Sequence, residues 1–410
     1  MTSNLSITMA DPTIKKCPYA SHDRIRAETP AYRDPVTGMY LVTRFADVRR
    51  LALDTKSLSN STGLVQSLEG SRNEAVNRLY AERGWLPVNT LVTADPPAHR
   101  LYRRLVEKAF TAKRVEGMHA YVRDLAIELI GGFVDRGEVE FVQEFAVRLP
   151  VMVIADQLGI SRGDLLLFKR WSDAAIELID PLLDPERELA LTGLIIEMQN
   201  YFIERVAQLR RQPADHLFSD LVQAEVEGRR LDNGELCSVL QQLLVAGNET
   251  TTSTLGSAMI LLIEEPGRAD GLFERPEQIA AFVEEVLRLR SPVQGLLRRA
   301  VTDVDVGGVT IPKGAIVHLL NAAANHDPEI FANPHAVDLC RTNRISHMSF
   351  GVGIHHCIGA QLARAELNIA INEITRRMRN YRYVDGANSV DHAVSYTYAP
   401  SKVHFYFDQR

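Results

Sequence analysis

The sequence predicts a mainly α-helical protein with a small β portion. From Pro96 onward, most segments place apolar residues with a period near 3.6, as on one face of an α-helix. One stretch, Asp232 to Glu265, is apolar nearly all round and predicts a buried helix of more than thirty residues. Of the 410 residues, 46% are hydrophobic and 24% charged, which excludes a disordered chain.

The first half of the chain opens with an arm, a strand and a connection. Residues 1–20 lack the basic-then-apolar pattern of a signal peptide and predict a flexible polar arm. A short strand, Met39 to Thr43, runs into a helix from Phe45, and the polar, glycine-containing residues 57–93 predict a long mobile connection. The helices expected next are Ala98 to Phe110, Val115 to Arg136, Arg148 to Leu158, Gly163 to Leu178 and Pro185 to Arg211.

The second half starts with the long helix, where Asp232 and Glu235 have the spacing of a capping box. A helix of that length can run through the centre of a large domain, so we expect residues 1–410 to form one domain. The remaining elements are a helix from Pro276 to Leu289, a hairpin over Val304 to Leu319 with its turn at Pro312-Lys-Gly, a helix from Ile358 to Met378 and a β-rich tail, Val394 to Phe407.

Charge and cysteine usage narrow the class of protein. The chain has 46 Lys and Arg against 52 Asp and Glu, a net charge of −6, which argues against a nucleic-acid binder. It lacks a run of about 18 apolar residues, so no membrane span is expected. The four cysteines, Cys17, Cys237, Cys340 and Cys357, are far apart, which favours a reducing compartment such as the cytoplasm over a disulfide framework.

Cys357 has the most informative surroundings. Residues 350–359 read Phe-Gly-Val-Gly-Ile-His-His-Cys-Ile-Gly, in which Gly351 and Gly353 permit a tight turn. The start of a helix favours a thiolate over a thiol, and a lone cysteine does not make a zinc site, whereas haem iron takes one protein thiolate. The alternative is a buried cysteine that acts as a small hydrophobic residue, which is how we interpret Cys17, Cys237 and Cys340.

Residues 350–359 resemble the haem-ligand signature of the cytochrome P450 family, Phe-Gly-x-Gly-x-His-x-Cys-x-Gly. The resemblance extends from Asp95 to the C-terminus and is to the soluble bacterial members. It implies the cytochrome P450 fold, with haem b (iron protoporphyrin IX) held between the long central helix and the helix after Cys357. It also implies that Cys357 is the metal ligand and that Phe350, Gly351 and Gly359 adjoin the haem.

Residues 246–251, Ala-Gly-Asn-Glu-Thr-Thr, interrupt the apolar pattern of the long helix. A local break in the helix that holds O₂ and water would explain polar groups at buried positions. The segment resembles the family's oxygen-activation motif, which places Ala246 at the cofactor and makes Glu249 and Thr250 the catalytic acid and alcohol that deliver protons. A kink stabilised by hydroxyl–backbone hydrogen bonds is the alternative.

Glu285 and Arg288 lie three residues apart on one helix face. Taken alone, they would form an ordinary surface ion pair. They resemble the family's structural Glu-x-x-Arg pair, whose third partner is usually an Arg or His two residues after a Pro. Here Ala336 occupies that position, and Arg341 or His335 would have to substitute.

The haem propionates need cations. By resemblance, His99 and Arg103 would bind them from the motif Asp95 to Arg103, together with Arg298, while His347 and His355 match two histidines that flank the signature. The substrate candidates are mostly apolar, although each is equally a plain core residue: Trp85, Val88, Val245, Val293, Gln294, Leu296 and Thr397.

The resemblance implies a monooxygenase that activates O₂ and hydroxylates a small to medium hydrophobic substrate, terpenoid-, steroid- or aromatic-like. The chain has no room for a flavin or iron–sulfur module, so electrons would come from a ferredoxin and its reductase. Arg104, Lys108 and Arg364 would form a basic patch for an acidic ferredoxin. We expect a monomer. A haem-binding sensor and a peroxide-driven peroxygenase are the alternatives, and the acid–alcohol pair argues against both.

Overall fold

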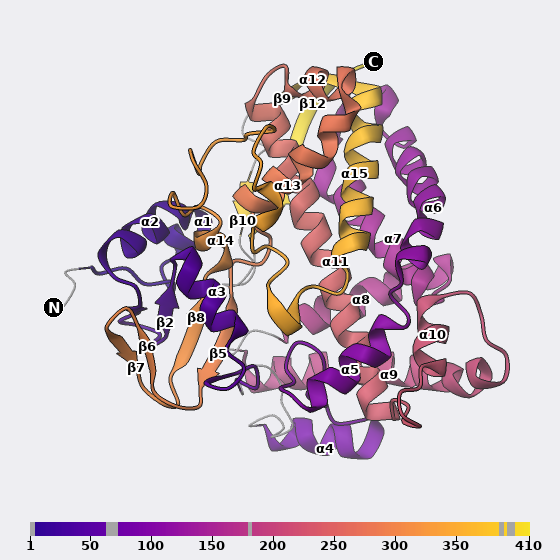
Figure 1. Ribbon diagram of the computed structural model, residues 1–410. Helices are drawn as coiled ribbons and strands as arrows, with labels where there is room; N and C mark the ends of the chain where they lie inside the picture. Colours follow the sequence, from indigo (N-terminus) through magenta and orange to yellow (C-terminus); the bar gives the residue numbers. More distant parts are fainter. Residues whose placement is uncertain (1–4, 63–72, 179–182, 385–388, 392–397) are drawn as a thin grey trace. The chain divides into compact units, whose positions relative to one another are not determined.

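The computed structural model describes residues 5–62, 73–178, 183–384, 389–391 and 398–410 (Figure 1). The chain divides into two compact units. Unit 1 comprises Met1–Ser59, Met118–Pro150 and Glu249–Arg410, and unit 2 comprises Asn60–Gly117 and Val151–Asn248. The single domain predicted for residues 1–410 stays a prediction. None of the helices in the described ranges combines the length and the apolar content needed to cross a membrane.

The predicted dominance of helices is confirmed in both units. Unit 1 contains α1 (Pro12–Lys16), α2 (Tyr19–Glu28), α3 (Phe45–Leu53), α12 (Arg268–Glu274), α13 (Ile279–Leu289), α14 (Asn321–Ala324) and α15 (Ala360–Arg377). Unit 2 contains α4 (Glu74–Arg83), α5 (Ala98–Glu107), α8 (Leu165–Glu177), α9 (Pro185–Arg211) and α10 (Leu217–Gln223). The chain passes between the units within α6 (Ala112–Gly131), α7 (Arg148–Gln157) and α11 (Asn233–Glu264).

The β portion lies in unit 1. Its largest sheet has the strand order β1-β2-β8-β5-β3, in which β2 and β8 are parallel and the other neighbours antiparallel. These strands are β1 (Tyr32–Arg33), β2 (Tyr40–Val42), β3 (Leu58–Ser59), β5 (Leu296–Ala300) and β8 (Ile316–Leu319). Smaller sheets pair β4 (Glu138–Glu140), β12 (His404–Gln409) and β9 (Met378–Tyr383), β10 (Ser389–Asp391) with β11 (Ala399–Lys402), and β6 (Val304–Val306) with β7 (Val309–Ile311).

An apolar core joins the five-stranded sheet to α3. Val48 and Leu51 of α3 pack in one buried cluster with Val317 and Leu319 of β8. Met348, from the segment that leads to Cys357, is buried in the same cluster. The sheet therefore anchors the loop that carries the cysteine, because moving Met348 would expose apolar surface to water.

The long helix α11 begins as predicted. The Asp232 carboxylate accepts a hydrogen bond from the Glu235 N–H at 2.9 Å, and the Glu235 carboxylate accepts one from the Asp232 N–H at 3.1 Å. The capping box is thus complete. The expected break at residues 246–251 is wrong, because α11 is continuous over 32 residues. Ser253 and Thr254 instead bond their hydroxyls to the carbonyls of Glu249 and Thr250, both at 2.7 Å, without interrupting the helix.

The N-terminal arm is not the flexible polar segment that its composition predicted. Leu5, Ile7 and Met9 are buried in a second apolar cluster of unit 1. The Ile7 N–H donates to the Tyr32 hydroxyl at 3.1 Å, and the Met9 N–H donates to the Asp34 carboxylate at 2.8 Å. The alternation of apolar and polar residues over this short stretch was the signal in the sequence, and two helices, α1 and α2, follow it.

The predicted connection over 57–93 and the predicted hairpin are also corrected. Residues 63–72 lie outside the described ranges, but 57–62 and 73–93 include β3 and α4, so the segment is not a plain connection. The hairpin turns at Gly307-Gly308, not at Pro312, and joins β6 to β7. Both glycines have positive φ, +57° and +86°, as a two-residue hairpin turn requires. The next strand, β8, pairs with β2 and β5 instead.

Buried titratable groups make the stability of unit 1 depend on pH. Burial lowers the pKa of His22 to about 3, that of His318 to about 4 and that of His326 to about 3, from an ordinary value of 6.5. Below pH 6.5, the unfolded chain therefore binds protons that the folded chain does not. Burial raises the pKa of Glu366 to about 8, so between pH 4.5 and 8 the folded chain binds a proton that the unfolded chain does not. This one carboxyl stabilises the fold as the pH falls, whereas the three imidazoles destabilise it.

We expect the free energy of unfolding to fall as the pH drops from 6.5 to 4.5, by roughly 1.4 kcal/mol per pH unit for each net proton. Urea titrations at a series of pH values would measure this slope. His318→Gln should reduce it by about one proton, whereas His119→Gln, at an exposed position, should leave it unchanged. Equal slopes for the two variants would contradict the prediction.

Candidate functional site

Cys357 lies in unit 1 at the end of a tight loop that precedes α15. The Cys357 N–H donates to the Phe350 carbonyl at 2.8 Å and closes the loop. Gly351 and Gly353 have φ of +68° and +72°, in the left-handed region that favours glycine. A Cβ on Gly353 would lie 2.7 Å from the Leu53 side chain, so α3 packs directly against the loop. The glycines of the signature are thus required by the backbone and by this close approach.

The segment before the loop is held by the end of α13. The Ser349 hydroxyl donates to the Leu287 carbonyl at 2.6 Å and lies 3.0 Å from the Ser291 hydroxyl. Asn325 donates to the Ser349 hydroxyl at 2.9 Å and accepts from the Met348 N–H at 2.6 Å. Sequence reasoning missed Asn325 and Ser349, since neither belongs to a recognisable motif.

Arg298 and His355 line the same small, enclosed cavity, which has room for about one water. Its volume is about 10 Å³, and the residues that line it are Ala52, Leu296, Arg298, Leu319, Asn321, Gly351, Val352 and His355. Arg298 is 5% exposed and comes from β5. The structure therefore brings together one predicted propionate ligand, Arg298, two other predicted cofactor contacts, His355 and Gly351, and one substrate candidate, Leu296.

Glu285 and Arg288 form a fully buried ion pair, not a surface one. Arg288 donates to both carboxylate oxygens of Glu285, at 2.8 and 2.9 Å, and both side chains are 0% exposed. The third partner is Arg341, whose Nε lies 3.0 Å from the same carboxylate. His335 instead pairs with Asp23, and Ala336 contributes only its carbonyl, to Arg288. The centre of the Phe331 ring lies 5.3 Å from the guanidinium carbon of Arg288 and 5.8 Å from that of Arg341.

The predicted cofactor contact of His347 stays a prediction, and the structure shows its partners within the protein. Its Nδ1 accepts from the Ser349 N–H at 3.2 Å, so the ring proton is on Nε2, which lies 3.0 Å from a carboxylate oxygen of Glu284. Both ring nitrogens are therefore used within the protein. Glu284, next to the predicted Glu285, is a residue that the sequence did not single out.

The acid–alcohol motif lies on α11, where the chain passes from unit 2 to unit 1 between Asn248 and Glu249. Glu249 and Thr250, in unit 1, are half-buried. Ala246 is exposed and Val245 half-buried, both in unit 2. Asn248 hydrogen-bonds Ser172 of α8 at 3.1 Å and so is partnered within unit 2. A Cβ added to Gly247 would lie 3.5 Å from the nearest side-chain carbon of Ile154, an ordinary van der Waals contact. Packing therefore does not require a glycine at this position.

The other predicted propionate ligands lie on α5 of unit 2. His99 is 2% exposed, and burial together with the nearby Arg103 charge lowers its pKa. Arg103 pairs with Glu107 at 2.6 Å. Their helical spacing is confirmed, while their role toward a propionate stays a proposal.

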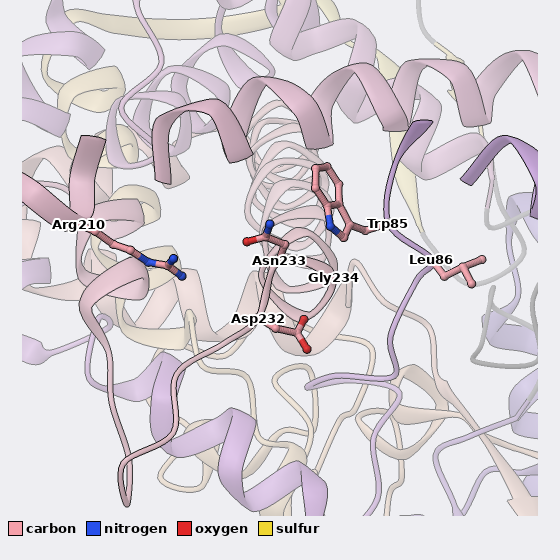
Figure 2. Close-up of a pocket in the computed structure, with 6 residues that line it drawn as sticks. All are labelled: Trp85, Leu86, Arg210, Asp232, Asn233 and Gly234. Carbon is pink, nitrogen blue, oxygen red and sulfur yellow. The ribbon is translucent and has the colours of Figure 1, made fainter. Parts of the chain in front are cut away.

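The substrate candidates are scattered over both units. Trp85 lines an open hollow of about 560 Å³ at the start of α11, together with Leu86, Arg210, Asp232, Asn233 and Gly234 (Figure 2). The hollow carries charges of both signs and is not the apolar cavity that a hydrophobic substrate would need. The Val88 N–H donates to Ser238 at 2.9 Å, Gln294 is 4% exposed, Val293 is half-buried, and Thr397 lies outside the described residues.

The three cations predicted to receive a ferredoxin are already engaged. Arg104 pairs with Glu227, and Lys108 donates to the Glu225 carbonyl, both within unit 2. Arg364, in unit 1, pairs with Glu284 at 2.6 Å. Their role as a docking patch for a ferredoxin stays a prediction, and Arg104 remains 57% exposed.

The donor set near Cys357 suits a haem better than a bare metal ion. Within the described ranges, no group of three or more His, Cys, Asp or Glu could hold a metal. Unit 1 has one cysteine close to a glycine, since a Cβ added to Gly359 would lie 4.0 Å from the Cys357 sulfur. It also has two side chains that can carry a positive charge, Arg298 and His355, which line one cavity. A single thiolate with cations for propionates fits an iron porphyrin.

The sequence model of the family described as Cytochrome P450 matches residues 277–382. A solved structure of cytochrome P450 CYP109Q5 from Chondromyces apiculatus is 32% identical, covers 98% of this chain and 98% of its own, and superposes with a TM-score of 0.87. This chain belongs to the cytochrome P450 family. The 6-deoxyerythronolide B hydroxylase of Saccharopolyspora erythraea is 36% identical over 286 residues, 70% of this chain and 69% of its own.

A third relative has a ligand in its structure. CYP109E1 from Bacillus megaterium, in complex with testosterone, is 27% identical, with a TM-score of 0.80, and covers 95% of this chain and 99% of its own. This P450 therefore has the P450 fold, a haem cofactor and a monooxygenase activity, as the family and its hydroxylases have. A non-enzymatic sensor is set aside.

The three-residue ion network should carry a large part of the stability of unit 1. Arg341→Ala leaves the Glu285 carboxylate buried with one partner fewer, so we expect it to lower the free energy of unfolding by about 3–5 kcal/mol. Arg382→Ala removes an exposed arginine whose pair with Asp408 spans 3.4 Å, and should cost under about 1 kcal/mol. Guanidinium titrations measure the free energy of unfolding of both variants. Equal decreases for Arg341→Ala and Arg382→Ala would show that the buried network stabilises unit 1 no more than an exposed ion pair does.

Proposed function

We propose that this P450 hydroxylates a small to medium hydrophobic organic substrate, terpenoid-, steroid- or aromatic-like. Cys357 is the residue on which the proposal depends, because its loop is closed by the Phe350 carbonyl and is fixed to both α3 and α13. The substrate class is supported by the mostly apolar candidates Val88, Val245, Val293 and Leu296, and by the testosterone complex of the relative CYP109E1.

We further propose that the cofactor is haem b, with Cys357 as the iron ligand. When bound, the haem supplies O₂ activation and oxygen transfer, the hard chemistry of the reaction. Arg298 and His355 bind a propionate from unit 1, and His99 and Arg103 are the propionate ligands offered by unit 2. Phe350, Gly351 and Gly359 shape the backbone around the sulfur.

Glu249 and Thr250 are proposed to move protons on α11. A carboxyl beside a hydroxyl can pass protons inward from solvent, and both side chains are half-buried, so they retain contact with water. The hydroxyls of Ser253 and Thr254 bond to the carbonyls of the same two residues, which fixes the backbone at this point. Gln294 is a candidate for one polar contact with the substrate.

The electron donor is proposed to be a ferredoxin with its reductase, and the protein to act as a monomer in the cytoplasm. Four cysteines that lie far apart in the sequence suit a reducing compartment. Of the three cations considered for donor docking, Arg104 is 57% exposed, whereas Arg364 is 31% exposed and bound by Glu284.

The haem ligation is tested optically. The reduced protein with carbon monoxide should absorb at the wavelength typical of thiolate-ligated haem, and Cys357→Ala should lose that band entirely. Cys237 is buried as predicted, whereas Cys17 and Cys340 are exposed, which corrects their interpretation as buried cysteines. Cys340→Ala is the control at an exposed cysteine and should keep the band. A purified protein that takes up no haem, or a band that survives Cys357→Ala, would refute the assignment.

The proton role is tested by product formation per electron consumed. Glu249→Gln should lower the rate of product formation by roughly 100-fold, within the range that a positioned acid contributes, while substrate binding and the carbon monoxide spectrum stay normal. Thr250→Ala should divert electrons to hydrogen peroxide. Glu264→Gln, at the exposed last residue of α11, is the control. If Glu249→Gln and Thr250→Ala both form as much product per electron as the wild-type protein, Glu249 and Thr250 have no part in the mechanism.

A further inference from the structure

Glu284 is a buried carboxylate that the proposed mechanism does not use. It is 7% exposed and accepts hydrogen bonds from His347 Nε2 at 3.0 Å and from Arg364 at 2.6 and 3.0 Å. Burial by itself would raise its pKa, but the hydrogen bonds from His347 and Arg364 hold the pKa at about 2. Glu284 is therefore ionised at neutral pH, and both of its oxygens are occupied.

Two of its partners lead to the cysteine loop by separate routes. His347 hydrogen-bonds Glu284 through Nε2 and accepts a hydrogen bond on Nδ1 from the N–H of Ser349, the residue before Phe350. Arg364, one helical turn into α15, places its guanidinium carbon 4.3 Å from the centre of the Phe350 ring. A guanidinium at that distance over a phenyl face makes a favourable cation–π contact. Phe350 in turn accepts the Cys357 N–H on its carbonyl at 2.8 Å.

The geometry limits how Arg364 can move. Its Nε and one terminal nitrogen bind the two oxygens of Glu284 side by side, so the plane of the guanidinium is set by α13. A lysine has no such fork. The Phe350 ring therefore lies against a cation whose position and orientation are both fixed.

We propose that Arg364, oriented by Glu284, is a positioning residue for Phe350 and, through Phe350, for the Cys357 sulfur. The inference rests on the proposed function, in which that sulfur binds haem iron. Its consequence is that Arg364 limits access of water to the sulfur and slows conversion of the bound thiolate to a thiol. Glu284 acts one step further away, by keeping Arg364 in place.

The measurement is the rate at which the reduced carbon monoxide complex changes from the thiolate-type band to the thiol-type band under mild denaturant. Arg364→Gln should raise this rate roughly fivefold, in line with the loss of one cation–π contact. Arg364→Lys should give an intermediate rate, because it keeps a cation but not the fork. Glu284→Gln should raise the rate as well, since it frees Arg364 without removing the guanidinium.

The chain offers a closely matched control on the same helix. The side chain of Arg377 is 31% exposed, as that of Arg364 is. It pairs with Glu373, whose side chain is 5% exposed, against 9% for the side chain of Glu284. Arg377→Gln should leave the conversion rate unchanged. Equal rates for Arg364→Gln and Arg377→Gln would overturn the inference.

A second variant separates positioning from general loosening of the fold. In a Phe350→Leu background, which lacks the ring, Arg364→Gln should add nothing further to the rate. An undiminished effect in that background would show that Arg364 does not act through Phe350. A wild-type protein without any thiolate-type band would instead defeat the proposed function, so the two failures are distinguishable.

Discussion

The loop that carries Cys357 depends on two buried carboxylates at adjacent positions of α13. Consecutive residues of an α-helix point about 100° apart, so Glu284 and Glu285 face different neighbours. Glu285 binds the guanidinium groups of Arg288 and Arg341, and Glu284 binds His347 and Arg364. A buried charge is costly unless its partners are complete. Glu285 therefore holds the segment of Arg341 against α13, and Glu284 holds those of His347 and Arg364.

The cysteine loop is positioned as a result of these anchors. Hydrogen bonds from Ser349 and Asn325 tie its beginning to α13, and Met348 is buried in the core beneath the five-stranded sheet. The left-handed backbone at Gly351 and Gly353 then turns the chain so that the Cys357 N–H meets the Phe350 carbonyl. A ligand loop held before the cofactor binds pays little reorganisation cost on binding, which is what a stable metal–thiolate bond needs.

Local signals predicted local structure well. The capping box at Asp232 and Glu235 and the apolar pattern after it located α11, because a helix start depends only on residues within one turn. The same signals failed where contacts between distant segments decide. Polarity alone suggested a flexible N-terminal arm, yet Ile7 is buried in an apolar cluster, where the Tyr32 hydroxyl accepts a hydrogen bond from its N–H. The hairpin turn was placed at a proline, although two consecutive glycines, Gly307 and Gly308, suit a two-residue turn better.

By itself, the sequence determined the helical class, the cysteine with its glycine-rich context and the pairing of Glu285 with Arg288, since each depends on residues close together in the chain. Only the tertiary structure decided that Arg341 and not His335 completes the ion network, that His347 binds Glu284, and that Arg364 lies over Phe350. Those choices depend on which side chains come within hydrogen-bond distance of the buried Glu284 and Glu285 carboxylates. The arginines and the histidine that do so lie 56 to 80 residues further along the chain. The folded backbone settles that geometry, and no local pattern records it.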